Sequence, residues 1–179
     1  NQPSQKSNWN QLDIKLTTLF ELPDSTPENP EVYFYHPDFV VTDSTGNIVV
    51  ADRALNKLFI FSEYGKFLDS FGQRGRGPNE FLKINGMTIN DSDEILVFDQ
   101  SSQMVKKFTS SGSYVTSIDF QTTIADVEFE HWKNNIFLFY LIDVPTNVGT
   151  NYLLHIYSPN NELIGEFIPY KNLELLDNE

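Results

Sequence analysis

The chain has 179 residues, of which 40% are hydrophobic and 14% aromatic, which is enough for the core of one domain of ordinary size. Its formal net charge of −13 argues against broad binding to nucleic-acid phosphates or anionic lipid, since both usually require a basic surface. Cysteine is absent, which excludes disulfides and thiolate metal sites, and no apolar run approaches the roughly 18 residues of a membrane helix.

The N-terminal part of the chain is polar at first and then strand-like. Residues 1–11, which include NQPSQKSN, are predicted to be a polar tether because they show no apolar periodicity. Residues 12–37 are predicted to contain N-terminal strands, LDIKLTTLF and EVYFYH, separated by a proline-rich turn. Alanine is rare in the whole chain whereas Phe, Tyr, Ile, Val and Thr are frequent, so strands are expected rather than helices.

Two long segments then align without a gap at an offset of 47 residues. The first begins at Val40 with VVTDSTGNIVVAD, and the second begins at Met87 with MTINDSDEILVFD. The matched pairs are Ile48 and Ile95, Val50 and Val97, Asp52 and Asp99, Phe61 and Phe108, Gly65 and Gly112, and Phe71 and Ile118. A third, more divergent copy runs from NNIFLFYL to LLHIYSPNNELIGEF and carries the insertion IDVPTNVGTN in one turn. The chain therefore contains an internal repeat.

Each copy has the same order of four short strands separated by polar turns. Gly65 and Gly112 fall where a hairpin turn requires positive φ. Four short antiparallel strands per repeat are typical of a β-propeller blade, and the gap-free duplication favours this fold over a β-sandwich. The predicted all-β organisation is blade 1 and its joint at 38–81, blade 2 at 82–123, blade 3 at 124–170 and an acidic C-terminal tail at 171–179.

The first copy resembles the NHL repeat. The residues that carry this resemblance are Val41, Asp43, Gly46, Asn47, Val50, Ala51, Asp52, Leu58, Phe61, Gly65, Lys66, Phe71 and Gly72. The pattern G-x-G-P-x-E-F that follows, from Gly75 to Phe81, is similar to six-bladed β-propeller proteins of Bacteroidetes-type bacteria. That resemblance implies an extracytoplasmic protein, in the periplasm or at the outer-membrane surface, and often a lipoprotein with an upstream lipid anchor.

Three blades and a few N-terminal strands are too few to close a propeller, which needs four to eight blades. An open ring would leave apolar blade faces uncovered. The chain is therefore expected to be an incomplete ring or part of a six-bladed propeller. Either missing blades of the same chain or a homo-oligomer would complete the ring.

The most distinctive loop is FGQRGRGPNEF, residues 71–81. It is neither a P-loop, because no Gly-Lys-Ser/Thr follows, nor a dinucleotide fingerprint, because Pro and Gly interrupt any following helix. We interpret it as the joint between the outer strand of one blade and the inner strand of the next, with Phe81 wedged between the blades. Arg74 and Arg76 have no packing role in this arrangement, so both are candidate ligand-binding residues for an anionic group.

Two further residues are candidates for ligand binding. Arg53 follows the second strand of blade 1, and Trp132 lies in the turn EHWKNN, where an indole could stack on a sugar or a peptide. His36, His131 and His155 share no metal-ligand spacing, and the chain has no G-x-S-x-G or H-E-x-x-H motif. We therefore predict no catalytic residue, no metal site and no cofactor.

The acidic residues have structural explanations that compete with metal binding. Asp43, Asp91 and Asp93 lie in tight turns, where Asx turns explain them without a calcium ion. The stretch DVEFE places three carboxylates on one face of a strand, Asp126, Glu128 and Glu130. We expect these to be a solvated face, with an accessible cation site as the alternative.

These observations predict a non-catalytic β-propeller scaffold that binds a protein, peptide or glycan through loops on one face. The alternative is a propeller hydrolase or lyase with a central divalent metal, similar to the lactonases and amidating lyases that resemble this fold. Such enzymes gather their metal ligands from several blades, so no local motif would reveal them. Nucleic acid is not an expected partner because of the negative charge.

Overall fold

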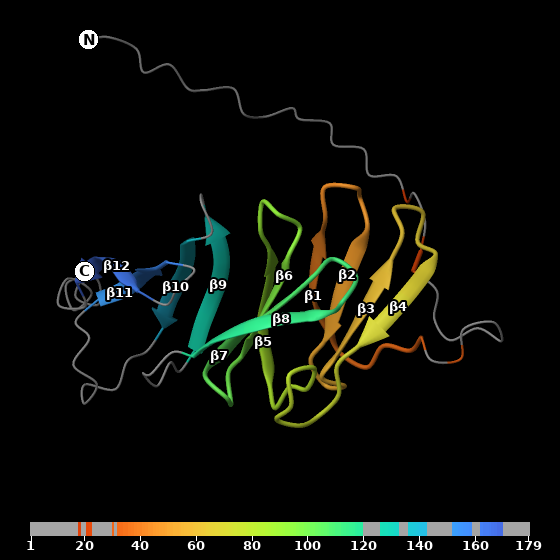
Figure 1. The fold of residues 1–179 in the computed structure, drawn as a ribbon, viewed down its shortest axis with the longest axis horizontal. Helices are drawn as coiled ribbons and strands as arrows, with labels where there is room; N and C mark the ends of the chain where they lie inside the picture. Colours follow the sequence, from red (N-terminus) through yellow and green to blue (C-terminus); the bar gives the residue numbers. More distant parts are fainter. Residues whose placement is uncertain are drawn as a thin grey trace, which may run out of the picture.

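The computed structural model describes residues 18, 21–22, 30, 32–119, 126–132, 136–142, 152–158 and 162–169. These residues form twelve β-strands in three four-stranded antiparallel sheets, which we name blades 1, 2 and 3 (Figure 1). The predicted all-β propeller architecture is confirmed, and the three blades form an incomplete ring. In this described part of the chain, no helix has the length and apolarity needed to cross a membrane.

Each blade is a simple meander in which successive strands are neighbours. Blade 1 contains β1 (Pro37–Thr42), β2 (Ile48–Asp52), β3 (Lys57–Phe61) and β4 (Phe67–Phe71). Blade 2 contains β5 (Ile84–Ile89), β6 (Ile95–Asp99), β7 (Met104–Phe108) and β8 (Tyr114–Asp119). Blade 3 contains β9 (Asp126–Trp132), β10 (Ile136–Ile142), β11 (Tyr152–Tyr157) and β12 (Leu163–Pro169). The first strands of the blades, β1, β5 and β9, lie side by side as the innermost strands (Figure 1).

The hydrophobic pattern of each strand reflects its place in the blade. Every residue of β6 is buried, because this strand lies inside its sheet and the blade has a neighbour on either side. In β8, the outer strand of the same blade, only Ile118 is buried. Continuous apolar strands therefore mark the middle of a blade, and polar strands mark its outer edge.

The largest described core lies between blades 1 and 2. It contains Val49, Ala51, Leu58 and Ile60 from blade 1, Phe81 from the joint, and Ile84, Met87, Ile95, Val97 and Phe108 from blade 2. Phe81 is fully buried there, with its ring centroid 5.7 Å from that of Phe108. Phe71 packs on Phe108 from the other side at 4.8 Å. The prediction that residues 71–81 form a joint with Phe81 between two blades is confirmed.

The opposite face of blade 1 has no blade against it in the described structure. Its outer part is covered by Val32 and Phe34, which pack on Val50, Phe59 and Phe61. Toward the inner strand this cover is missing, and Val40 is 61% exposed. The structure thus leaves an apolar strip of blade 1 open.

The segment that covers blade 1 differs from its prediction. Residues 32–36 form no strand, although strands were predicted within 12–37. The reason is that the backbone amides of Tyr35 and His36 donate to the Asp52 carboxylate instead of to a neighbouring strand. The rest of 12–37 lies outside the described residues apart from positions 18, 21–22 and 30, as do the tether at 1–11 and the tail at 171–179.

The turns of blades 1 and 2 repeat with the same 47-residue offset as the strands. Gly65 and Gly112 adopt φ of 77° and 84°, so the positive φ predicted for them is confirmed. Asp93 has φ of 58° at the place that Gly46 occupies in blade 1 with 85°. Aspartate tolerates this left-handed region better than most side chains do.

Candidate functional site

The joint loop, residues 72–81, is closed by its own backbone. The amide of Gly75 donates to the Phe81 carbonyl at 3.1 Å, and the amide of Phe81 donates to the Gln73 carbonyl at 2.8 Å. The amide of Glu80 donates to the Gly77 carbonyl at 3.1 Å. A phosphate cradle presents its amides outward to the ligand. Here these amides are used within the loop, so the glycine-rich stretch is not such a cradle.

The Glu80 side chain stabilises the loop from within. Its carboxylate accepts the Gly77 amide at 2.8 Å and the side-chain amide of Gln73 at 2.8 Å. These hydrogen bonds, the Gly77 amide first, hold the pKa of Glu80 below its usual value of 4.5. At the start of the loop Gly72 adopts φ of 93°, and a Cβ there would lie 2.8 Å from the Asn56 carbonyl oxygen. Only glycine fits this close approach.

A buried lysine anchors the loop to blade 2. Lys106 on β7 is only 3% exposed, and its ammonium donates to the carbonyls of Gly77, at 2.9 Å, and Glu80. The ammonium also lies 5.4 Å from the centroid of the Phe81 ring. Burial lowers the pKa of Lys106 below 10.5, and the carboxylates of Asp99 and Glu80 oppose this effect.

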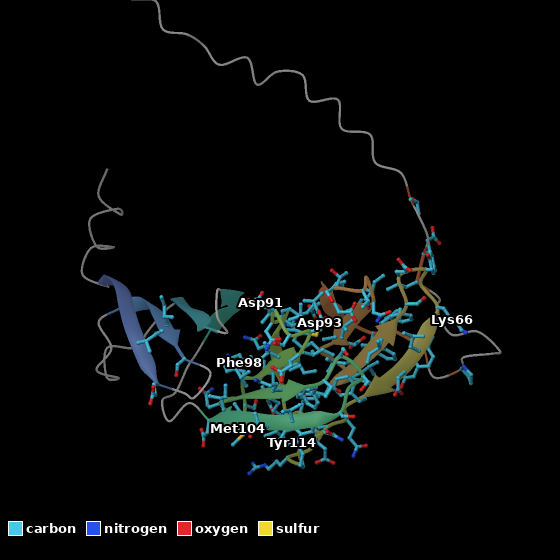
Figure 2. The ribbon with its side chains drawn as sticks, turned by 45° about the horizontal axis from the view of Figure 1, so that its top comes forward. Lys66, Asp91, Asp93, Phe98, Met104 and Tyr114 are labelled. Carbon is cyan, nitrogen blue, oxygen red and sulfur yellow. The ribbon has the colours of Figure 1, made fainter. Side chains whose placement is uncertain are left out.

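A pocket of about 480 Å³ lies between the joint loop and the outer strands of blade 2. Two cationic and four hydroxyl side chains line it, namely Arg76, Lys106, Ser101, Ser102, Tyr114 and Ser117. Pro78, Leu82 and Met104 supply its apolar part. Figure 2 shows Met104 and Tyr114 on the outer strands of blade 2. A pocket of this size suits a small molecule or a single residue of a polymer.

A second pocket of similar size also borders the joint loop. Phe71, Gln73, Asn79 and Glu80 are among its lining residues. It contains no cationic side chain, and its one carboxylate is already hydrogen-bonded within the loop. Of these two pockets, the first has the chemistry suited to an anionic ligand, and we name it the Arg76 pocket.

The four predicted ligand-binding residues are not all brought together. Arg76 lines the Arg76 pocket, whereas Arg74, in the same loop and also exposed, does not. Neither arginine forms an ion pair with another described residue. Arg53 lies in the β2–β3 turn at the same end of the blades, where its guanidinium pairs with Asp38 at 3.3 Å.

Trp132 is the last residue of β9, and the structure does not describe its side chain. In Figure 1, β9 ends at the upper edge of the sheets, whereas the joint loop runs along the lower edge. The structure therefore places Trp132 and the arginines at opposite ends of the blades.

Lys106, Tyr114 and the three serines of the pocket are missing from the sequence-based candidates. One signal for Lys106 was present in the repeat itself. At the offset of 47 residues, Lys106 aligns with Phe59, which is fully buried in blade 1. A charged residue at the place of a core phenylalanine is a detectable anomaly.

Of the aspartates in the turns, Asp43 forms the Asx turn that was predicted, whereas in blade 2 the Asx turn is formed by Asn90 and not by Asp91 or Asp93. The Asp43 carboxylate accepts the amides of Thr45 and Asn47 at 2.9 and 2.8 Å, which is an Asx turn. Partial burial, which would raise the pKa of Asp43, is outweighed by hydrogen bonds from Thr45 and Asn47, so this pKa is lowered. Asp93 in the next blade accepts the Ser44 amide at 2.8 Å and thereby links the two blades.

Asp91 and Asp93 lie at the same end of blade 2, as Figure 2 shows. Among the residues whose side chains the structure describes, no group of three His, Asp or Glu could hold a metal ion. Asp126, Glu128 and Glu130 lie in β9, where alternate residues share one face of the strand. The structure does not describe their side chains.

Comparisons with known proteins agree with this architecture. Residues 39–174 match a family, DUF5128, that is described as a 6-bladed beta-propeller. No curated protein matches the chain. Among solved structures, a Bacteroides fragilis protein described as exported has a TM-score of 0.64 at 13% identity and covers 76% of this chain. A DUF4221 family member from Bacteroides vulgatus has a TM-score of 0.55 at 14% identity and covers 80%.

Virginiamycin B lyase from Staphylococcus aureus also has a TM-score of 0.55, at 15% identity, and covers 80% of this chain. These identities establish a common fold and leave activity open. The chain spans only 38% of the Bacteroides fragilis protein, 44% of the Bacteroides vulgatus protein and 43% of the lyase. With three four-stranded blades and a match over residues 39–174, the chain belongs to this family of 6-bladed β-propeller proteins.

Proposed function

We propose that this chain is part of a non-catalytic β-propeller scaffold that binds a protein, peptide or glycan through the loops at one end of its blades. The observation that carries the proposal is the Arg76 pocket, which places an exposed arginine over a hydroxyl-lined hollow. The joint loop that presents Arg76 is held by its own hydrogen bonds and by Lys106. A pre-ordered loop loses little conformational freedom when it binds a ligand.

The chemistry of the pocket supports binding rather than catalysis. Arg76 and Lys106 can attract an anion, and the hydroxyls can donate and accept hydrogen bonds. None of the residues that line the pocket is a histidine or a carboxylate, which are the commonest general bases. Binding therefore needs no group beyond those already in the pocket.

The proposal is tested by amide chemical-shift mapping with isotope-labelled protein. We expect at least one member of a panel of peptides and glycans to shift the amides around Arg76, Ser101 and Tyr114 in a saturable way. Mass spectrometry of the recovered ligand is expected to find it chemically intact. Shifts scattered over the surface, or a ligand converted to product, would count against a non-catalytic binding scaffold.

A metal-dependent hydrolase or lyase is the alternative function. The observation that favours it is the position of β9, an innermost strand whose Asp126, Glu128 and Glu130 share one face. Virginiamycin B lyase has the same fold. Titration calorimetry with Mn²⁺ or Ca²⁺, on the wild type and on Glu128→Gln, distinguishes the two: tight stoichiometric binding lost in the variant would favour the enzyme.

We also propose that further blades, of the same chain or of a second copy, cover the open face of blade 1. The exposure of Val40 next to an otherwise packed apolar cluster supports this, as does the family's six-bladed description. Sedimentation of the 20.6 kDa chain together with its thermal unfolding tests the proposal. A monomer of this mass that unfolds cooperatively would contradict it.

The compartment that we propose is extracytoplasmic, in the periplasm or at the outer-membrane surface. The fold neighbour described as exported supports this assignment. Fractionation of cells that express the protein tests it, because protease added to intact cells or to spheroplasts should degrade the protein. Full protection in spheroplasts would contradict the assignment.

A further inference from the structure

We propose that the Arg76 pocket binds an acidic sugar, with the carboxylate of a hexuronic acid between Arg76 and Lys106 and the ring hydroxyls on the serines. This inference rests on the proposed binding function and specifies the ligand of the same pocket. It follows from three properties of the pocket: its positive charge, the state of the loop amides and its hydroxyl groups.

The charge of the pocket is opposite to that of the chain. The protein carries a net charge of −13, yet the two charged side chains that line this pocket are both cationic. An ammonium has three donors, and the carbonyls of Gly77 and Glu80 take two from Lys106. The third donor of Lys106 has no acceptor among the residues that the structure describes, and the exposed Arg76 supplies a planar fork that suits a carboxylate. The pocket therefore favours an anionic ligand.

The hydrogen bonds of the joint loop decide between a carboxylate and a phosphate. Sites for phosphate groups usually include several free backbone amides, at a helix N-terminus or in a glycine-rich nest. The amides of Gly75, Gly77, Glu80 and Phe81 are all used within the joint loop. Two cations beside a loop in which these four amides are already hydrogen-bonded suit a singly charged carboxylate better than a phosphate group.

The hydroxyl groups and the apolar edge favour a sugar as the carrier of this carboxylate. Four hydroxyls line the pocket, and the Tyr114 hydroxyl donates to Ser117 Oγ at 3.2 Å. The Ser117 hydroxyl is then directed to donate elsewhere, and hydroxyls that can both donate and accept match those of a sugar. Leu82 and Met104 offer apolar contact for the C–H face of the ring. A simple carboxylate would make no contact with most of these hydroxyls.

Three small probes separate the parts of this proposal. Glucuronate has both the ring and the carboxylate, glucose has only the ring, and acetate has only the carboxylate. We expect glucuronate to shift the amides of Arg76, Ser101 and Ser117 in a saturable way. Glucose and acetate should each bind at least about tenfold more weakly, because each lacks one half of the contacts.

A matched pair of arginine variants tests the position of the carboxylate. Arg76→Gln and Arg74→Gln remove the same charge from the same exposed loop, but only Arg76 lines the pocket. We expect R76Q to weaken glucuronate binding at least about fivefold and R74Q to weaken it less than about twofold, since most of the effect is local at physiological salt. Lys106→Met should weaken it as well, and circular dichroism will report whether this variant is folded.

The outcomes distinguish the inference from the function on which it rests. Equal binding of glucose and glucuronate, or equal effects of R74Q and R76Q, would overturn the acidic sugar while a binding scaffold still stands. A peptide with a free C-terminal carboxylate that binds in place of all three probes would do the same. If neither sugars, peptides nor proteins perturb the pocket, both proposals fail.

Discussion

Blades 1 and 2 follow the same plan down to single contacts, and they differ at one buried position. Phe34 packs on Phe59 in blade 1 at 5.1 Å between ring centroids. At the matching place in blade 2, Phe81 receives the Lys106 ammonium at 5.4 Å from its ring. An aromatic pair in one blade thus corresponds to a cation over an aromatic ring in the next.

The difference shows how one repeat can close this position within its core while its neighbour connects it to a pocket. In blade 1 this position is Phe59, whose ring is enclosed in an apolar cluster with Val32, Val50 and Phe61. A lysine carries its charge beyond the ring to the carbonyls of the joint loop, and a hydroxyl-lined pocket lies beside it. The fold tolerates both because the surrounding strands and turns are the same.

Transferring the lysine to the matching position of blade 1 should destabilise the protein strongly. Phe59→Lys would bury a cation among apolar side chains, with Lys57 already 5.1 Å from the ring that it replaces. We expect the free energy of unfolding to fall by about 3–5 kcal/mol, as for other unpaired buried charges. Urea denaturation measures this, and a loss below about 1 kcal/mol would show that blade 1 can also accommodate the cation.

The reverse exchange, Lys106→Phe, should be much milder. The variant gives blade 2 an aromatic pair like that of blade 1. The carbonyls of Gly77 and Glu80 lose the Lys106 ammonium, but they lie in a partly exposed loop where water can replace it. We expect a change of less than about 1.5 kcal/mol at neutral pH.

The pH dependence of the same variant gives an independent check. Burial lowers the pKa of Lys106, so just below pH 10.5 the unfolded chain binds more protons than the folded chain does. The wild type should gain stability from this group as pH rises through that window, and Lys106→Phe should lack this gain. A parallel pH profile for the two proteins would contradict the assignment.

The carboxylates at the ends of β2 and β6, Asp52 and Asp99, occupy equivalent positions but have different contacts. Asp99 accepts the amides of Leu82 and Lys83, one on each oxygen, at 3.0 and 2.9 Å. An asparagine side chain has one acceptor oxygen instead of two, so Asp99→Asn directs its NH2 donor toward one of these two backbone amides. It also removes the negative charge that attracts Lys106. We expect a loss of about 2–3 kcal/mol of unfolding free energy.

Asp52→Asn is the control for this prediction. One Asp52 oxygen accepts the amides of both Tyr35 and His36, and an asparagine oxygen can replace it there. The other oxygen accepts the Leu55 amide, in an adjacent turn, and the residue of blade 1 that corresponds to Lys106 is Phe59. The loss should therefore be about 1 kcal/mol smaller than for Asp99→Asn, and equal losses would show that Lys106 contributes nothing.

The repeat made most of the fold predictable, and the site only in part. The positive φ of Gly65 and Gly112, the Asx turns and the buried position of Phe81 all follow from local patterns that recur in two blades. The Arg76 pocket does not, because its walls come from the joint loop, the β6–β7 turn, β7 and β8. Of the residues that line the pocket, the sequence indicates only Arg76, as an arginine without a packing role.

The grouping of the predicted site residues was limited by strand direction. Trp132 and the arginines were assigned to ligand binding on one face, yet successive strands of a meander end at opposite edges of the sheet. Residues 32–36 were mistaken for part of a strand because their composition is strand-like. Their hydrogen-bond partner is the side chain of Asp52, which no periodic pattern reveals.

The first turns of blades 1 and 2 have their hydrogen-bonded carboxylate at different positions, and the pH dependence of stability can distinguish the two turns. Asp43 binds Asn47 in blade 1, whereas Asn90 binds Glu94 in blade 2, where Glu94 also pairs with Lys107 at 3.0 Å. Burial would raise the pKa of Glu94, but the hydrogen bonds from Asn90 and Lys107 outweigh it and lower this pKa below 4.5.

Glu94 therefore contributes stability above about pH 4.5 that is lost as the pH falls through its lowered folded-state pKa. We expect Glu94→Gln to cost about 0.5–1 kcal/mol at neutral pH and nearly nothing at about pH 2, where both proteins are uncharged at this position. Urea midpoints at the two pH values measure this. An equal cost at both would contradict an electrostatic origin.

The smallest expected effect concerns the contact between the two turns. Asp93 accepts the Ser44 amide of blade 1 at 2.8 Å and adopts φ of 58°, where blade 1 has Gly46. Asp93→Gly removes the contact between the blades but suits this φ, whereas Asp93→Ala removes the contact and retains the unfavourable φ. We expect the glycine variant to lie within about 0.5 kcal/mol of the wild type and the alanine variant about 1 kcal/mol below it. If the two variants unfold at the same urea concentration, the backbone conformation contributes nothing and the aspartate serves only to join the blades.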